Sequence, residues 1–155
     1  MNPRRLRIGE WITGAAGVAL LAVMFLDWYE SAAGSASAWE ALSILDVLLA
    51  IAALMGIATA VMAAAHDTPA VSLAIASLLL TVGAIATIAV LVRVIFVPDV
   101  AGEEADRALG LWLGLGASVG VTLGALASMR DERFPRGARV DVQVEQLPPP
   151  EGGKA

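Results

Sequence analysis

Two ionisable residues, Asp46 and Arg93, lie inside long apolar stretches of this chain of 155 residues. A charged side chain is costly to place in such a segment, so both are functional candidates by default. A carboxylate and a guanidinium at one depth can form a gate or a proton- or cation-coupled site. They can equally form a structural clamp that holds two helices in register.

The predicted positions of Asp46 and Arg93 favour an ion pair. The two residues fall on neighbouring antiparallel helices that a very short turn joins. At about 1.5 Å per residue, their Cα atoms differ by about 6–8 Å in depth, which an arginine side chain can cover. The pair is expected near the outer surface, where both groups can snorkel to water. This shallow depth favours the structural clamp.

Two further carboxylates are predicted on the same outer rim. Asp27 and Glu40 would join the pair there and leave the cluster with a net negative charge. The sequence Ser37-Ala38-Trp39-Glu40 also matches a capping box, in which the serine and the glutamate satisfy each other's backbone amides at a helix start.

Small residues at four-residue spacing are the second motif. Gly116, Gly120 and Gly124 form a continuous GxxxGxxxG stripe, and Gly56 lies in a similar pattern between two alanines. Missing side chains let helix backbones approach closely in lipid. The stripe either packs within the bundle or lets the fourth segment bind a second copy or a membrane-protein partner, and the sequence leaves both open.

Other catalytic chemistry is missing from the sequence. The chain has no cysteine and one histidine, and the apolar stretches hold no lysine. Thiolate metal sites, disulfides and serine–histidine or serine–lysine pairs are therefore excluded. No glycine-rich phosphate loop follows a strand. We expect no enzyme activity, no metal, no cofactor and no nucleic-acid partner.

Four apolar segments must position these residues. The chain is 58% hydrophobic and 16% charged, with a mean hydropathy of +0.76, and a soluble domain of this length could not bury so much apolar surface. A crossing needs about 20 apolar residues. The sequence predicts an all-α, integral membrane four-helix transmembrane bundle over residues 1–130. Its spans cover about 8–29, 38–65, 69–97 and 109–129.

Aromatic residues mark the predicted span ends. The expected interface belt, where amphipathic rings sit at headgroup level, is Trp11, Trp28, Tyr29, Trp39 and Trp112. A lipid bilayer is thus the first predicted partner.

Arginines predict the orientation. Arg4, Arg5 and Arg7 precede the first segment, and four more arginines follow the fourth, whereas the connection at 98–108 holds only Arg107. By the positive-inside rule, both termini are cytoplasmic in a multi-pass protein of the cell (inner) membrane. A cleaved secretory signal ending near 36–38 is the competing interpretation. The dozen or so residues between the apolar run and that position favour a retained span.

The remaining segments are short or polar. The connection at 30–37 is rich in serine, alanine and glycine. In the connection at 98–108, Glu103 and Arg107 predict a short surface helix, whose acidic residues either attract cations or solvate a helix start. Residues 131–155 are predicted to be a disordered cytoplasmic tail. Alternating valines at 140–144 leave open a short strand that pairs with a partner.

One stretch is similar to a known group of proteins. Asp27-Trp28-Tyr29, a small loop, Ala38-Trp39-Glu40-Ala41 and then Asp46 resemble small four-span bacterial membrane proteins with a Trp-Tyr … Ala-Trp-x-Ala … Asp signature. Asp27 stands where that group carries proline. The resemblance covers roughly 35 residues and the topology, and it implies no activity. It suggests that Trp39 and Asp46 share one helix face.

These patterns lead to two functional hypotheses. The first is a non-enzymatic membrane protein that acts as a structural or accessory helix-packing subunit. The alternative is a small oligomeric transporter or channel that uses Asp46 and Arg93.

Overall fold

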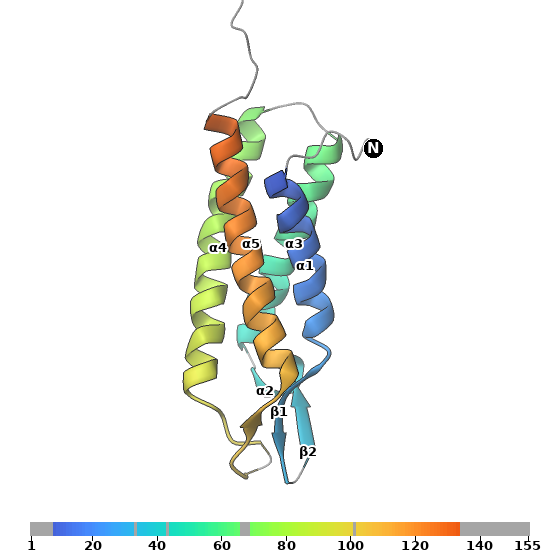
Figure 1. Ribbon diagram of the computed structural model, residues 1–155, viewed down its shortest axis with the longest axis vertical. Helices are drawn as coiled ribbons and strands as arrows, with labels where there is room; N and C mark the ends of the chain where they lie inside the picture. The colour runs from blue at the N-terminus through green and yellow to red at the C-terminus, as the bar shows by residue number, and fades with distance from the viewer. Residues whose placement is uncertain (1–7, 33, 43, 66–68, 101, 134–155) are drawn as a thin grey trace, which may run out of the picture.

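The computed structural model describes residues 8–32, 34–42, 44–65, 69–100 and 102–133. These form four long helices that lie side by side, with a small sheet at one end (Figure 1). The start of α1 and the end of α5 lie at the opposite end of the bundle. The elements are α1 (Ile8–Val23), β1 (Asp27–Ser31), β2 (Gly34–Ser37), α2 (Ala38–Ala41), α3 (Ile44–Ala65), α4 (Pro69–Ile95), β3 (Asp106–Arg107) and α5 (Leu109–Arg133).

Three helices, α3, α4 and α5, are long and apolar enough to cross a membrane, counting only the described residues. The apolar helix α1 is shorter, with 16 residues. Large apolar side chains are exposed on all four helices, for example at Val18, Leu54, Ile88 and Leu123. A soluble monomer rarely exposes so much contiguous apolar surface. The exposure agrees with the membrane setting that the composition predicts.

The first helix ends at Val23, before the boundary at Tyr29 that the apolar pattern predicts. The Leu26 N–H donates to the Val23 carbonyl at 3.0 Å, which tightens the last turn. The Trp28 indole Nε1–H turns back and donates to the same carbonyl at 2.9 Å. Carbonyls at a helix end need such partners. Trp28 therefore helps to end the helix instead of continuing it.

The connections at the sheet end pair with each other, which the all-α prediction missed. Their strand order is β2-β1-β3, and both pairings are antiparallel. Tyr29 lies opposite Arg107, and Glu30 lies opposite Asp106. The turn between β1 and β2 contains Gly34 with a φ of 145°, a conformation that side chains disfavour. Both connections are thereby joined in one small cap.

The surface helix predicted for residues 98–108 is wrong. Val100 and Glu103 exchange two backbone hydrogen bonds, of 3.0 and 3.1 Å, around a tight turn. Gly102 takes a φ of 81° there, a conformation that favours glycine. The turn at Gly102 therefore stands where the spacing of Glu103 and Arg107 predicted a helix, and Arg107 lies in β3.

The second apolar segment is two helices instead of one. The short α2 ends at the cap residue Leu42, and α3 begins at Ile44. The capping box before α2 is present. The Glu40 carboxylate accepts a hydrogen bond of 2.9 Å from the Ser37 N–H, and it accepts another of 2.9 Å from the Ser37 hydroxyl. The other two long helices begin as expected, at Pro69 and Leu109.

The apolar core runs along the bundle and continues into the cap. Trp28 and Tyr29 are both fully buried, although neighbours in a strand ordinarily face opposite sides. The pairing of β1 with β2 shifts register between Asp27 and Tyr29, as in a β-bulge. Such a bulge redirects side chains, and it lets two consecutive aromatic rings face the helices.

Candidate functional site

The closest helix contacts surround α1, which packs between α3 and α5. A Cβ at Gly14 would lie 2.6 Å from the Ala60 Cβ, and one at Gly17 would lie 2.7 Å from the Ala53 carbonyl oxygen. These distances are too short for any side chain. From α3, a Cβ at Gly56 would lie 3.0 Å from the Thr13 carbonyl oxygen. The glycines therefore bring α1 and α3 into direct backbone contact.

The glycine stripe of α5 is divided between two environments. A Cβ at Gly124 would lie 2.7 Å from the Thr13 backbone nitrogen, and one at Gly120 would lie 3.0 Å from the Ala16 Cβ. A Cβ at Gly116 would meet no atom within 4 Å. The part of the stripe at 120–124 is thus occupied by α1, and only Gly116 faces open space.

Hydroxyl groups in the helices mostly bond to their own backbone. Thr13 donates to the Gly9 carbonyl at 2.8 Å, and Ser128 donates to the Gly124 carbonyl at 3.0 Å. Among the described side chains, the hydroxyl pair of Thr87 and Thr122, 3.1 Å apart, does join α4 to α5. Bonding to the carbonyl four residues earlier satisfies a hydroxyl in an apolar setting without a partner helix.

Trp28 packs the cap against α5. A Cβ at Gly114 would lie 2.6 Å from the Trp28 Cη2 atom, and one at Gly110 would lie 2.8 Å from Trp28 Cδ1. The Ala108 N–H donates to the Trp28 carbonyl at 2.9 Å. The four-residue spacing of Gly110 and Gly114 was visible in the sequence, but nothing there indicated a tryptophan as their partner.

The other end of the cap binds the end of α4. The Tyr29 hydroxyl donates to the Arg93 carbonyl at 3.3 Å, and Arg107 Nε–H donates to the Val94 carbonyl at 2.7 Å. Burial raises the pKa of the Tyr29 phenol, although the nearby charges of Arg93 and Arg107 oppose this shift. Both arginines suit this place, because a helix C-terminus carries partial negative charge.

Asp46 and Arg93 lie at helix ends. Asp46 is buried in the first turn of α3, where its Oδ1 atom accepts a 2.6 Å hydrogen bond from the Val47 N–H. Arg93 lies in the last turn of α4 and is half-buried. No ion pair joins Asp46 to Arg93 in the part of the chain that the structure describes. The break before α3 explains the difference, because it gives the carboxylate a helix N-terminus to face.

The two rim carboxylates lie on the exposed side of the cap. Asp27 is opposite Ser37 in the sheet, and Glu40 binds Ser37 directly. The Ser37 N–H and then its hydroxyl lower the pKa of the Glu40 carboxyl. Trp39 is exposed whereas Asp46 is buried, and the break between α2 and α3 separates them. The expected shared helix face is therefore wrong.

Three of the five residues of the predicted aromatic belt lie on the surface of the bundle. Trp11 and Trp112 are about half exposed, and Trp39 is exposed beside Phe25, with ring centroids 5.8 Å apart. Trp28 and Tyr29 are instead buried in the cap. Rings that meet glycines and backbone carbonyls serve packing and not the interface.

Among the described residues, no three histidine, cysteine, aspartate or glutamate side chains gather as a metal site would require. Comparison with protein-family models, curated proteins and solved structures gives no match for this chain. We therefore infer function from the geometry of the bundle and its cap.

Proposed function

We propose that this chain is a four-span protein of the cell (inner) membrane that acts as a structural or accessory subunit. The observation that carries the proposal is the packing of α1, whose glycines and Thr13 touch α3 on one side and α5 on the other. Contacts of this closeness favour a fixed bundle, because backbones separated by no side chain leave no room for sliding.

The packing of α1 against α5 supports a fourth span. Gly9 lies against Ser128 at one end, and the Asp27 carbonyl lies against Gly110 at the other. Residues 110–128 of α5 cover about 27 Å at about 1.5 Å per residue. The hydrocarbon core of a bilayer is about 30 Å thick. The segment from α1 to β1 thus runs beside α5 for nearly this distance, although its helical part is short.

Charge supports the orientation. Arg4, Arg5 and Arg7 precede α1, and Arg130 lies near the end of α5, at the end of the bundle away from the sheet. The positive-inside rule makes this end cytoplasmic and the cap external.

The buried polar groups argue for structure over transport. The described hydroxyls of Thr13, Thr59 and Ser128 bond within their own helices. Among the residues that the structure describes, the buried carboxylates are Glu10 and Asp46. They lie in the first turns of α1 and α3, which start at opposite ends of the bundle. A coupled transporter needs ionisable groups along a pathway through the membrane. Here the two buried carboxylates lie at the two ends of the bundle instead.

Native mass measurement after extraction in a mild detergent tests the accessory role. We expect a mass above that of one chain, from a partner or a second copy. Gly116 is the open position of the α5 stripe, so Gly116→Leu should release the bound protein. Ala58→Leu, at an exposed position of α3, is the matched control and should retain it. A wild-type chain that is always alone would defeat the proposal.

A further inference from the structure

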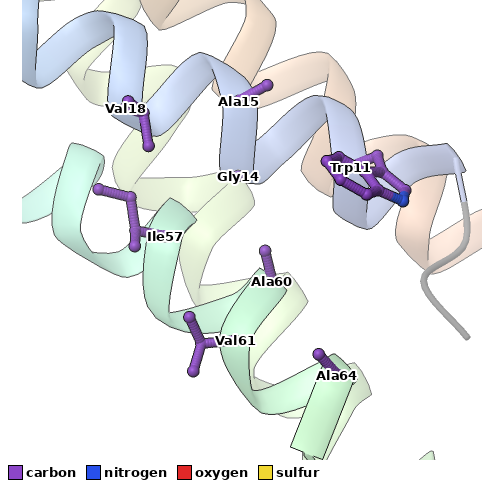
Figure 2. A pocket seen from close by; sticks show the side chains of 8 residues that line it. All are labelled: Trp11, Gly14, Ala15, Val18, Ile57, Ala60, Val61 and Ala64. Carbon is purple, nitrogen blue, oxygen red and sulfur yellow. The ribbon is translucent and has the colours of Figure 1, made fainter. Parts of the chain in front are cut away.

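Two arginines, Arg93 and Arg107, lie where the cap meets the end of α4. Arg93 is half-buried in the last turn of α4, and Arg107 lies in β3. Within the described residues, neither guanidinium forms an ion pair with a carboxylate. The apolar groove between α1 and α3, at the other end of the bundle, is lined by uncharged residues (Figure 2). The end of α4 thus presents positive charge without a counter-ion from the described chain.

Hydrogen bonds to the last carbonyls of α4 place both arginines at one level of the bundle. The Arg107 Nε–H donates to the Val94 carbonyl at 2.7 Å, and the Tyr29 hydroxyl donates to the adjacent Arg93 carbonyl at 3.3 Å. Burial raises the pKa of the Tyr29 phenol, and the charges of both arginines oppose this rise. The two positive charges thus lie near one phenol, where they repel each other. An anion bound to both arginines would relieve this repulsion.

The carboxylates of β1 and β3 lie on the other side of the sheet. Successive residues of a strand point to opposite sides. Tyr29 pairs with Arg107, and both contact α4. Glu30 pairs with Asp106, one residue along each strand, and both of these acids are exposed. The side of the sheet that faces the bundle is therefore positive, whereas the side that faces away is negative.

We infer that Arg93 and Arg107 bind the phosphate of a phospholipid in the leaflet on the cap side of the membrane. The inference rests on the proposed four-span bundle. A guanidinium binds phosphate oxygens through two parallel N–H bonds, which suits it to this anion. Ile95 and Phe96 are exposed beside the arginines. They offer apolar contacts to the acyl chains of the same lipid.

The depth of the arginines selects a lipid phosphate over a soluble anion. The apolar stretch Ala74–Ile95 has 22 residues and covers about 33 Å at about 1.5 Å per residue. The hydrocarbon core is about 30 Å thick. Arg93 is two residues from the end of this stretch, so its long side chain reaches the headgroup level by snorkelling. Lipid phosphates are concentrated at that level.

Photocrosslinking in nanodiscs measures this contact. A phosphatidylglycerol analogue with a diazirine on its headgroup is added at low concentration to phosphatidylcholine nanodiscs that hold the purified protein. Peptide mass measurement then locates the attached lipid, and we expect attachment at residues 91–107. Arg93→Gln should lower this yield about fivefold, through the loss of one basic contact. The Tyr29 hydrogen bond goes to the backbone carbonyl of Arg93, so this change leaves it intact.

Two further variants separate charge from folding. Arg130→Gln removes an exposed arginine at the opposite end of the bundle and should leave the yield at residues 91–107 unchanged. Arg93→Lys keeps the positive charge and should retain more of the yield than Arg93→Gln does. An equal yield for Arg93→Gln and the wild type would overturn the inference. An equal loss for Arg130→Gln would do so too.

A free anion is distinguished from a lipid in detergent. Inorganic phosphate should not raise the melting temperature of the lipid-free protein. If it stabilises the wild type but not Arg93→Gln, the site binds soluble phosphate and the lipid is the wrong ligand. The attached lipid is read from a peptide, separately from the mass of any bound protein. A chain without a protein partner therefore leaves this result intact.

Discussion

Trp28 fills a space that two glycines of α5 leave open. Its ring lies over Gly110 and Gly114, and its indole N–H binds the carbonyl of Val23. One side chain thus ends α1, anchors β1 and sets the position of α5. Such a residue tolerates few changes around it, because a packed core responds to every added methyl group.

Gly114→Ala should destabilise the protein by about 1–3 kcal/mol, because the new methyl group would overlap the Trp28 ring. Gly116→Ala, two residues along the same helix, meets open space and should be neutral or slightly stabilising. Thermal unfolding in detergent, followed by circular dichroism, compares the two variants. Equal melting temperatures would show that Trp28 does not lie against Gly114.

Asp46 and Arg93 should act independently. Asp46 lies at the N-terminus of α3 and Arg93 lies in the last turn of α4. No ion pair joins the two side chains in the described residues. The single changes Asp46→Asn and Arg93→Leu should each destabilise the protein. The double variant should lose the sum of the two effects to within about 0.5 kcal/mol. If the double variant is more stable than that sum predicts, Asp46 and Arg93 interact, as the structural clamp predicted from the sequence requires.

The cap is the element that joins the four helices at one end. It continues α1 through β1, leads into α2 through β2, and precedes α5 through β3. Tyr29 and Arg107 attach it to the last carbonyls of α4. We expect it to restrain α1, α4 and α5 directly, because they enter or contact the sheet, and to restrain α3 through the short helix α2 that precedes it.

A designed disulfide tests the pairing of β1 with β3. The chain has no cysteine, so Glu30→Cys with Asp106→Cys creates a single pair at facing positions. Facing residues of antiparallel strands have Cα atoms about 4.5–5.5 Å apart, within the range of a disulfide. Mild oxidation should crosslink this pair. Glu30→Cys with Glu104→Cys is the control and should crosslink less. Equal yields would contradict the sheet.

The sequence predicts the helices better than their ends. Apolar runs identified α3, α4 and α5, and Ser37 and Glu40 identified a helix start. The cap was missed because its strands are short and pair across distant parts of the chain. The sequence predicts a continuous helix around Asp46, since no proline or glycine marks the break before α3. The partners of the glycines depend on three-dimensional packing, which spacing alone does not specify.

At the scale of the whole molecule, polar and apolar groups are sorted along one axis. Exposed apolar side chains cover the four long helices, whereas exposed carboxylates gather on the cap, at Asp27, Glu30, Glu40 and Asp106. The close contacts of α1 with α3 and α5 are formed by glycines inside the bundle. This arrangement matches a protein whose sides face lipid and whose cap faces water.

The most direct test of the four-span account is cysteine labelling at the two ends of α1. Asn2→Cys and Ser35→Cys are treated separately with a membrane-impermeant maleimide in intact cells whose outer barrier is opened, and again after lysis. The account predicts that Ser35→Cys, exposed in β2, is labelled in intact cells. Asn2→Cys should be labelled only after lysis. Labelling of both in intact cells would mean that α1 does not cross the membrane, and would contradict the four-span bundle.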